Sequence, residues 1–468
     1  MLKTIIYMKQ LLLITILSLA WPFLTSAADT SKSIEGSPVM SQQSQSIWER
    51  DYLLGDWCGA RPDLNNKGVT ISLDYTAEVW GFVDGGLDRG SLYQGLFEGG
   101  LDFDFEKMMG WKGGSMRVNA LIPQNSNNNG PTFFTGSGFD SSNISANDTA
   151  RLFELWLQQD FLDDKLSLRA GQLAADDEFF LSETAGLFLG GNYGWGNNLA
   201  SNIPNGGPAY PVAGLGVRVK VQPVEQFYVM SALFQGDVGD QATNNQHGTY
   251  WDLGGDQGIF SINEMGYLLN QEENAKGLPG SYKFGGWAHT GDFSSFLYDD
   301  TGLSLADPAS SGIPALNHGT WGLYFIANQM VYRKKEGTDQ GLSVFWRIAG
   351  GPDNTSTIPF YTDFGASYKG LIPCRSDDTI GVSFGVEGYS DDLATTGDQR
   401  NSLNGTNEPV VGNEAIIEAT YQIQLAPWWY LQPDIQYIIN PAGGALNPNT
   451  GGKIQNAVVI GLRTGLTF

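Results

Sequence analysis

The sequence VTISLDYTAEVW, at residues 69–80, decides the fold class because apolar and polar residues alternate along it. Its odd-numbered positions, from Val69 to Val79, are all apolar, whereas most even-numbered positions carry Thr, Ser, Asp or Glu. Successive side chains of a β-strand point to opposite faces of the sheet. The stretch therefore predicts a strand with one apolar face and one polar face.

The same alternation recurs along the rest of the chain. It is found at residues 115–122, 153–158, 165–170, 215–221, 342–348, 380–387, 414–425 and 458–468, and is less regular at 321–332. Short connections are predicted at residues 221–224 and 426–429, and long ones, rich in Gly, Asn and Asp, at 125–148, 236–258 and 389–412. Short turns on one side and long polar loops on the other are typical of an outer-membrane barrel.

Alternation alone fits both a soluble sandwich, whose apolar faces point inward, and a membrane barrel, whose apolar faces point toward lipid. Aromatic residues gather near strand ends, as at Phe103 and Trp428, which favours the barrel. The last alternating strand ends on Phe468, which looks like the signal that the barrel-assembly machinery of bacteria reads. We therefore predict an all-β protein with a single transmembrane antiparallel barrel at residues 69–468, surrounded by outer-membrane lipid.

The N-terminal residues are predicted to direct export. Residues 1–27 combine a positive start, a mostly apolar run at 11–24 and small residues at the end, which is the pattern of a secretory signal peptide. Residues 28–68 are predicted to form an N-terminal periplasmic segment. Pro62 and Gly68 fit the beginning and end of one short helix in it. After residue 27, no stretch of about 18 apolar residues remains that could span a membrane as a helix.

The composition excludes several classes of protein. The 468 residues include 26 Lys and Arg and 50 Asp and Glu, for a net charge of −24, which argues against nucleic acid as a partner. Hydrophobic residues make up 41% of the chain, which argues against intrinsic disorder. Two cysteines exclude a tetracysteine zinc site, and three histidines, at 247, 289 and 318, argue against a histidine-based metal site or catalytic triad, so neither a metal nor a cofactor is predicted.

Five segments, in order along the chain from about residue 48 to the end, resemble the carbohydrate-selective porins of Gram-negative bacteria, the OprB type. They include LGDWCGAR at 54–61, ELWL at 154–157, QMVYR at 329–333, YQIQLAPWW at 421–429 and the C-terminal strand at 458–468. The resemblance implies a barrel of about sixteen strands in the outer membrane of a Gram-negative bacterium. It also implies passive diffusion of small sugars, from monosaccharides to small oligosaccharides, with no enzymatic step.

Two positions depart from the family pattern. Cys58 and Cys374 stand where these porins usually have glycine. Both are expected on the periplasmic side, which is an oxidising compartment. We therefore consider a disulfide between them that pins the N-terminal segment to the barrel rim, with two unrelated thiols as the alternative.

Side chains on the polar faces are the candidates for lining a sugar channel. Arginines and carboxylates can bond the hydroxyl rim of a sugar, and an aromatic ring can face its C–H surface. The alternative for each residue is that it only fills the lumen or, for the two tryptophans, marks a strand end. The candidates are Glu78, Trp80, Arg117, Glu154, Trp156, Arg169, Arg218, Arg347 and Glu387.

Other functions stay open at this point. One alternative is a general or cation-preferring porin. An alternative of another class is a secreted all-β carbohydrate-active enzyme or lectin, in which two of the carboxylates between Asp176 and Glu183 would act as a catalytic pair. The apolar outer faces are also compatible with a homotrimer.

Overall fold

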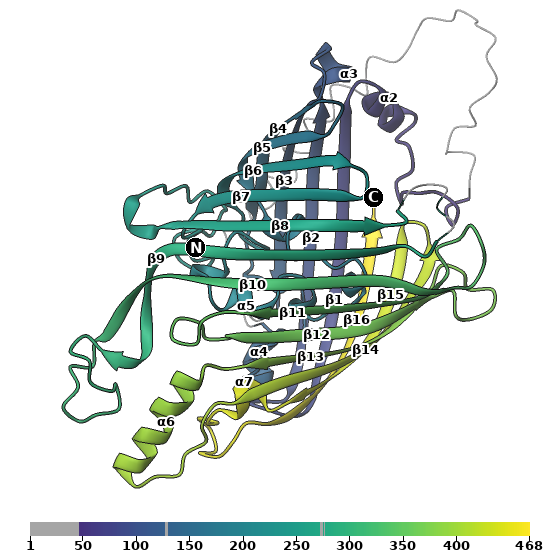
Figure 1. Ribbon diagram of the computed structural model, residues 1–468. Helices are drawn as coiled ribbons and strands as arrows, with labels where there is room; N and C mark the ends of the chain where they lie inside the picture. Colours follow the sequence, from purple (N-terminus) through teal and green to yellow (C-terminus); the bar gives the residue numbers. More distant parts are fainter. Residues whose placement is uncertain (1–45, 127–129, 272–274, 276) are drawn as a thin grey trace, which may run out of the picture. The chain divides into compact units, whose positions relative to one another are not determined.

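The protein is described by a computed structural model for residues 46–468, apart from residues 127–129, 272–274 and 276. The predicted signal peptide at residues 1–27 lies outside the described residues. In the described part, sixteen antiparallel strands close into one barrel, in which each strand pairs with its neighbours in the chain and β1 pairs with β16 (Figure 1). The predicted all-β barrel and its strand number are confirmed.

The strands follow one another around the barrel. Their bounds are β1 Val69–Gly86, β2 Gly90–Asp104, β3 Gly114–Asn125, β4 Arg151–Phe161, β5 Leu166–Leu173, β6 Gly214–Val224, β7 Phe227–Gln235, β8 Ile259–Leu269, β9 Gly280–Asp299, β10 Pro314–Arg333, β11 Gly341–Gly350, β12 Phe360–Lys369, β13 Thr379–Gly388, β14 Asn413–Ala426, β15 Trp429–Ile439 and β16 Gln455–Thr467.

The described helices lie outside the strands: α2 precedes β1, and the others lie in the connections between strands. The α-helices are α2 Ala60–Asn66, α3 Phe105–Met109, α4 Thr132–Thr135, α5 Asn197–Ala200, α6 Asp391–Asn404 and α7 Pro441–Gly444. The 3-10 helices are η3 Ala175–Asp177, η4 Ala185–Leu187, η5 Gly191–Tyr193, η6 Pro204–Gly206 and η7 Gly255–Gln257. Among these described residues, no helix has both the length and the apolar character required to cross a membrane.

The alternation read from the sequence sorts side chains between the inside and the outside of the barrel. On β1, Glu78 and Trp80 are buried in the interior, whereas Val79 and Val83 on the opposite face are 55% and 46% exposed. The apolar rows therefore form the outer surface, as a bilayer requires. Closure of the barrel leaves no free sheet edge, because β1 pairs with a strand on each side. Ala77 of β1, for example, lies opposite Gly95 of β2 and opposite Thr464 of β16.

The barrel has two different ends. At the turn end, β14 and β15 are joined by two residues, and the chain finishes with a hydrogen bond from the Phe468 amide to the Leu73 carbonyl, 2.9 Å. At the loop end lie the long connections, including α6 (Figure 1). The short connection predicted at 221–224 is displaced, because β6 continues through Val224 and the turn consists of residues 225–226.

The N-terminal segment, residues 46–68, packs against the turn end. Trp48 stacks on Trp428 and Trp429 at centroid distances of 6.4 and 6.2 Å. The predicted helix is α2, and Gly68 follows it with a φ of 86°, a conformation that glycine adopts without strain. Arg61 donates hydrogen bonds to the carbonyls of Ile71 and Phe468 and so ties the segment to both β1 and the end of the chain.

The structure does not support the hypothesis of a disulfide between Cys58 and Cys374. Both side chains are exposed, and no bond joins them in the described part of the chain. Cys58 lies between Leu53, which bonds Thr467 of β16, and Arg61, whereas Cys374 lies in the turn between β12 and β13. Cys58 therefore belongs to the segment fastened to β16 and the end of the chain, and Cys374 to a different turn.

Candidate functional site

Two of the long connections fold into the barrel instead of remaining outside it. We call residues 130–150 the first inward loop and residues 174–213 the second inward loop. Both make hydrogen bonds to interior side chains of strands that are distant in sequence, which places them inside the lumen. Tyr210 of the second loop donates to the Ile144 carbonyl of the first, 2.8 Å, so the two are also joined to each other.

The second inward loop is attached to one wall by carboxylates. Glu178 receives two hydrogen bonds from Arg218 of β6, at 2.8 and 2.9 Å, and lies 3.5 Å from the Arg169 guanidinium of β5. Glu183 pairs with Lys283 of β9 at 2.9 Å. Because Arg169 and Arg218 are opposite each other in the β5–β6 register, Glu178 also neutralises two adjacent positive charges.

The same loop is held at the opposite wall through its backbone. Arg347 of β11 donates to the carbonyls of Asn192 and Gly194 at 2.7 and 3.0 Å. Glu418 of β14 accepts from the amides of Leu189 and Gly190 at 2.6 and 3.1 Å. The loop therefore crosses the lumen from β6 to β14 and covers the interior faces of the strands between.

The first inward loop is held at the strands where the barrel closes. Ser142 donates to Glu78 of β1 at 2.6 Å, and the Gly138 amide donates to Glu414 of β14 at 3.0 Å. Gln436 of β15 donates to the Ser141 carbonyl at 2.9 Å. This loop covers β14, β15 and β1, and its Ile144 packs with Leu96, Leu121 and Phe153 on the interior wall of β2 to β4. The half of this wall nearer the turn end keeps polar side chains that are partly exposed.

Polar side chains gather on that wall. Arg117 of β3 contacts three carboxylates, with distances of 3.0 Å to Asp102, 3.2 Å to Glu154 and 3.9 Å to Glu98. The Arg117, Glu98 and Asp102 side chains are 26%, 37% and 38% exposed, whereas Glu154 is buried. One arginine is therefore shared by three acidic groups at an accessible position inside the barrel.

An aromatic ring continues this group toward β5. Trp156 donates to Glu154 at 3.0 Å, and the Arg169 guanidinium lies 4.0 Å from the Trp156 ring centroid, a cation–π contact. We call Glu98, Asp102, Arg117, Glu154, Trp156 and Arg169 the wall cluster. It joins hydrogen-bonding groups of both charges to one aromatic side chain, which is the chemistry that a polyhydroxylated solute requires.

The remaining sequence candidates are interior but covered by the inward loops. Trp80 is fully buried and donates to Glu78 at 2.8 Å, and Glu78 pairs with Arg463. The other buried candidates are Arg218, bonded to Glu178, Arg347, paired with Asp363, and Glu387, which accepts from Asn197. These five side chains hold the inward loops and do not face open space. Their positions therefore agree with the alternative that they only fill the lumen.

Sequence reasoning missed Glu98 and Asp102, although the signal was present. Residues 94–102 alternate between an interior row with Gln94, Leu96, Glu98 and Asp102 and an exterior row with Gly95, Phe97 and Leu101. The glycines in this stretch have no side chain and so obscure the alternation of apolar and polar residues. Glu178, considered as a catalytic acid, is instead part of the Arg169–Arg218 ion-pair group.

Two carboxyl groups on the inward loops have raised pKa values. Removal from bulk water raises the pKa of Asp140 from 3.8 to about 7. Removal from water and the neighbouring Asp177 raise the pKa of Asp176 from 3.8 to about 8. Asp176 accepts from the Tyr210 amide at 3.0 Å and Asp140 from the Ser142 amide at 2.9 Å, so both groups belong to the packing of the loops.

We expect the stability of the folded barrel to fall as pH rises from about 4 to about 7. In this range the folded state binds more protons than the unfolded chain, so each group lowers stability by about 1.4 kcal/mol per pH unit. Denaturant titrations at pH 5 and pH 8 measure the difference. Asp140→Asn keeps the acceptor oxygen and should remove the share of Asp140 while that of Asp176 remains. The same pH dependence in this variant as in the wild type would contradict the assignment.

Comparison with known proteins identifies the family to which the chain is similar. The model of the family described as "Carbohydrate-selective porin, OprB family" matches residues 88–468. Porin B of Pseudomonas aeruginosa is 26% identical over 439 residues, covering 89% of this chain and 91% of that protein. The putative porin QuiX of Acinetobacter baylyi is 24% identical, covering 94% of this chain and 98% of that protein.

A solved structure shares the fold. The high-pH structure of Pseudomonas putida OprB superposes with a TM-score of 0.81 at 22% identity and covers 91% of this chain and all of that one. The family match includes the wall cluster and both inward loops. The chain belongs to the OprB family of carbohydrate-selective porins and is an outer-membrane β-barrel of a Gram-negative bacterium, not an enzyme.

Proposed function

We propose that small sugars cross the barrel by passive diffusion along the wall cluster, between β2–β5 and the second inward loop. Sugar hydroxyls exchange their hydrogen bonds with water for bonds to Arg117, Glu98 and Asp102. Trp156 offers an apolar surface beside them. The observation that carries the proposal is the contact of Arg117 with three carboxylates at an accessible place next to this ring.

Charge pairing makes such a wall suited to neutral solutes, because the three carboxylates and two guanidinium groups of the wall cluster leave a formal net charge of only −1. Ion pairing between Arg117 and the carboxylates reduces the field that a free ion would follow, while each partner keeps unused donors or acceptors for hydroxyl groups. Binding has to stay weak enough for the solute to leave. Partly exposed ion pairs satisfy this condition, because a sugar replaces water at them and does not have to break them.

Glucose should reduce the ion current through a single channel in a saturable way. The expected cause is occupancy of the wall cluster, which excludes ions while a sugar is bound. Planar-bilayer recordings at increasing glucose concentration measure it, with a zwitterionic amino acid of similar size as the control. A decrease that only follows the conductivity of the bulk solution, equally for both solutes, would contradict binding at the wall.

We also propose that the turn end faces the periplasm and that assembly machinery recognises the C-terminal strand. Phe468 closes this strand, and its amide bonds Leu73 of β1. Deleting Phe468 should lower the amount of folded, heat-modifiable protein in outer membranes several-fold while the refolded protein keeps its channel. Unchanged amounts would exclude this role. A homotrimer is compatible with the apolar outer surface, and crosslinking in membranes tests it.

A further inference from the structure

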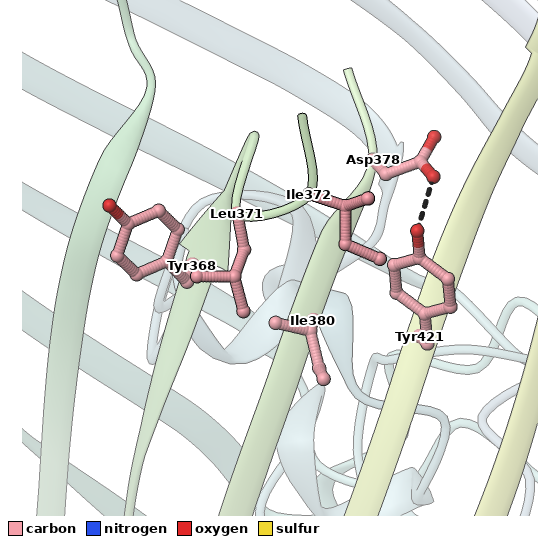
Figure 2. Close-up of a pocket in the computed structure, with 6 residues that line it drawn as sticks. All are labelled: Tyr368, Leu371, Ile372, Asp378, Ile380 and Tyr421. Atoms are coloured by element: carbon pink, nitrogen blue, oxygen red, sulfur yellow. Dashed lines mark hydrogen bonds between the residues drawn. The ribbon is translucent and has the colours of Figure 1, made fainter. Parts of the chain in front are cut away.

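An apolar groove lies on the outer surface of the barrel at the turn end, away from the sugar pathway (Figure 2). Its floor is a row of exterior side chains on neighbouring strands, in which Ile380 is the register partner of both Tyr368 and Tyr421. Leu371 and Ile372, from the turn between β12 and β13, form its upper wall and remain 48% and 45% exposed. The groove is small, with a cavity volume of about 60 Å³.

The orientation of this row follows from its neighbour. A Cβ atom placed on Gly381 would lie 2.6 Å from Leu187 of the second inward loop, so position 381 faces the lumen. Position 380 then faces the bilayer, because adjacent strand residues point to opposite sides. The groove is therefore open to lipid and not to the channel.

Hydrogen bonds hold the groove in shape. Asp378, at the end of the turn, accepts from the Tyr421 hydroxyl, as Figure 2 shows, and from Arg375 through two bonds of 2.8 Å. It also accepts from the Gln424 amide at 3.0 Å. The turn is thus fastened to β14, which keeps Leu371 and Ile372 beside Ile380 without a ligand.

Positive charge lies next to the groove. The turn between β10 and β11 begins with Arg333, Lys334 and Lys335, and the Lys334 ammonium bonds the Gly370 carbonyl, one residue before Leu371. Within the described part of the chain none of these three forms an ion pair, whereas Lys369 and Arg375 are paired with Asp339 and Asp378. The chain has a net charge of −24, yet three adjacent cations lie beside this apolar groove. They could attract an anionic group to it.

We propose that this groove binds one acyl chain of an anionic phospholipid of the periplasmic leaflet, with the phosphate group against Lys334 and Lys335. The inference rests on the proposed orientation of the turn end toward the periplasm. It is independent of the sugar pathway, because no residue of the wall cluster lines the groove. Charge complementarity selects the headgroup, and the apolar row selects the chain.

Native mass spectrometry of the detergent-purified, delipidated mature protein tests the proposal. The probes are phosphatidylglycerol and phosphatidylcholine with identical acyl chains. We expect one phosphatidylglycerol to be retained about 25-fold better than phosphatidylcholine. The double variant Lys334→Glu, Lys335→Glu should remove this preference, since each lysine near a lipid phosphate contributes about a fivefold effect. Ile380→Trp should fill the groove and reduce retention of both lipids.

Two controls separate a site from general attraction. Lys107→Glu with Lys112→Glu changes the same charge on another turn at the turn end, and Ile435→Trp adds the same bulk on the outer face of β15. Both should retain lipid like the wild type, with heat-modifiable mobility showing that all variants are folded. Equal retention by every variant, or equal losses in the controls, would overturn the proposal. Loss with the lysine variant but not with Ile380→Trp would also overturn it, because the chain would then lie elsewhere.

Discussion

Arg117→Met should turn this sugar-selective channel into a cation-selective one. Arg117 is the one cation that contacts Glu98, Asp102 and Glu154 among the described ion pairs, so its removal leaves these three carboxylates on the channel wall without a paired cation. Their field then attracts cations and repels anions. We expect the cation-to-anion permeability ratio to rise several-fold in reversal-potential measurements.

Sugar binding should weaken in the same variant. Hydrogen bonds to charged groups contribute about 1.5–3 kcal/mol, so losing the guanidinium should weaken saturable glucose block by about tenfold or more. Arg89→Met is the matched control, since it removes an equal charge from an exposed ion pair with Asp84 at the loop end. If Arg117→Met changes neither ion selectivity nor glucose block beyond this control, Arg117 does not line the path.

Glu178→Gln should shift selectivity in the opposite direction. The substitution keeps the shape of the side chain but leaves Arg169 and Arg218, which are register partners, without their shared carboxylate. The guanidinium groups of Arg169, in the wall cluster, and of Arg218, beside it, then favour anions. The cation-to-anion permeability ratio should fall below the wild-type value. Arg117→Met and Glu178→Gln should therefore shift this ratio in opposite directions.

The same substitution should loosen the second inward loop. Arg218 is almost fully buried, and removing the partner of a buried charge costs about 1–3 kcal/mol or more. We expect larger current noise and a lower unfolding temperature. Glu183→Gln is the control on the same loop, because Glu183 pairs with Lys283 but is 58% exposed and should contribute less. Equal effects of the two variants would show that loop charge in general, and not the Glu178 bridge, matters.

The sequence predicts the strands well because a barrel in a bilayer forces one residue in two to face lipid. The start of β1 at Val69 and the closing strand β16 follow directly from this rule. The irregular stretch at 321–332 also has a physical reason. Interior residues of β10 such as Tyr324 and Ile326 pack on the second inward loop, where Phe180 meets Tyr324 edge to face at 5.1 Å.

The site could be predicted only in part. Alternation places Arg117, Glu154, Trp156 and Arg169 on the inner face, and the structure brings them together on β3–β5. Alternation cannot reveal that Arg347 is covered, because the covering atoms belong to Asn192 and Gly194, more than 150 residues away. Loops rich in glycine and asparagine carry no periodic signal that would show which of them enters the lumen.

Liposome swelling tests the central claim most directly. Purified wild-type protein and the Arg117→Met and Arg89→Met variants are compared with glucose, a disaccharide and a zwitterionic amino acid of similar size to glucose. We expect faster swelling with glucose than with the amino acid for the wild type and Arg89→Met, and loss of this difference for Arg117→Met. Equal rates for glucose and the amino acid in the wild type, or an unchanged difference in Arg117→Met, would contradict sugar selection by the wall cluster.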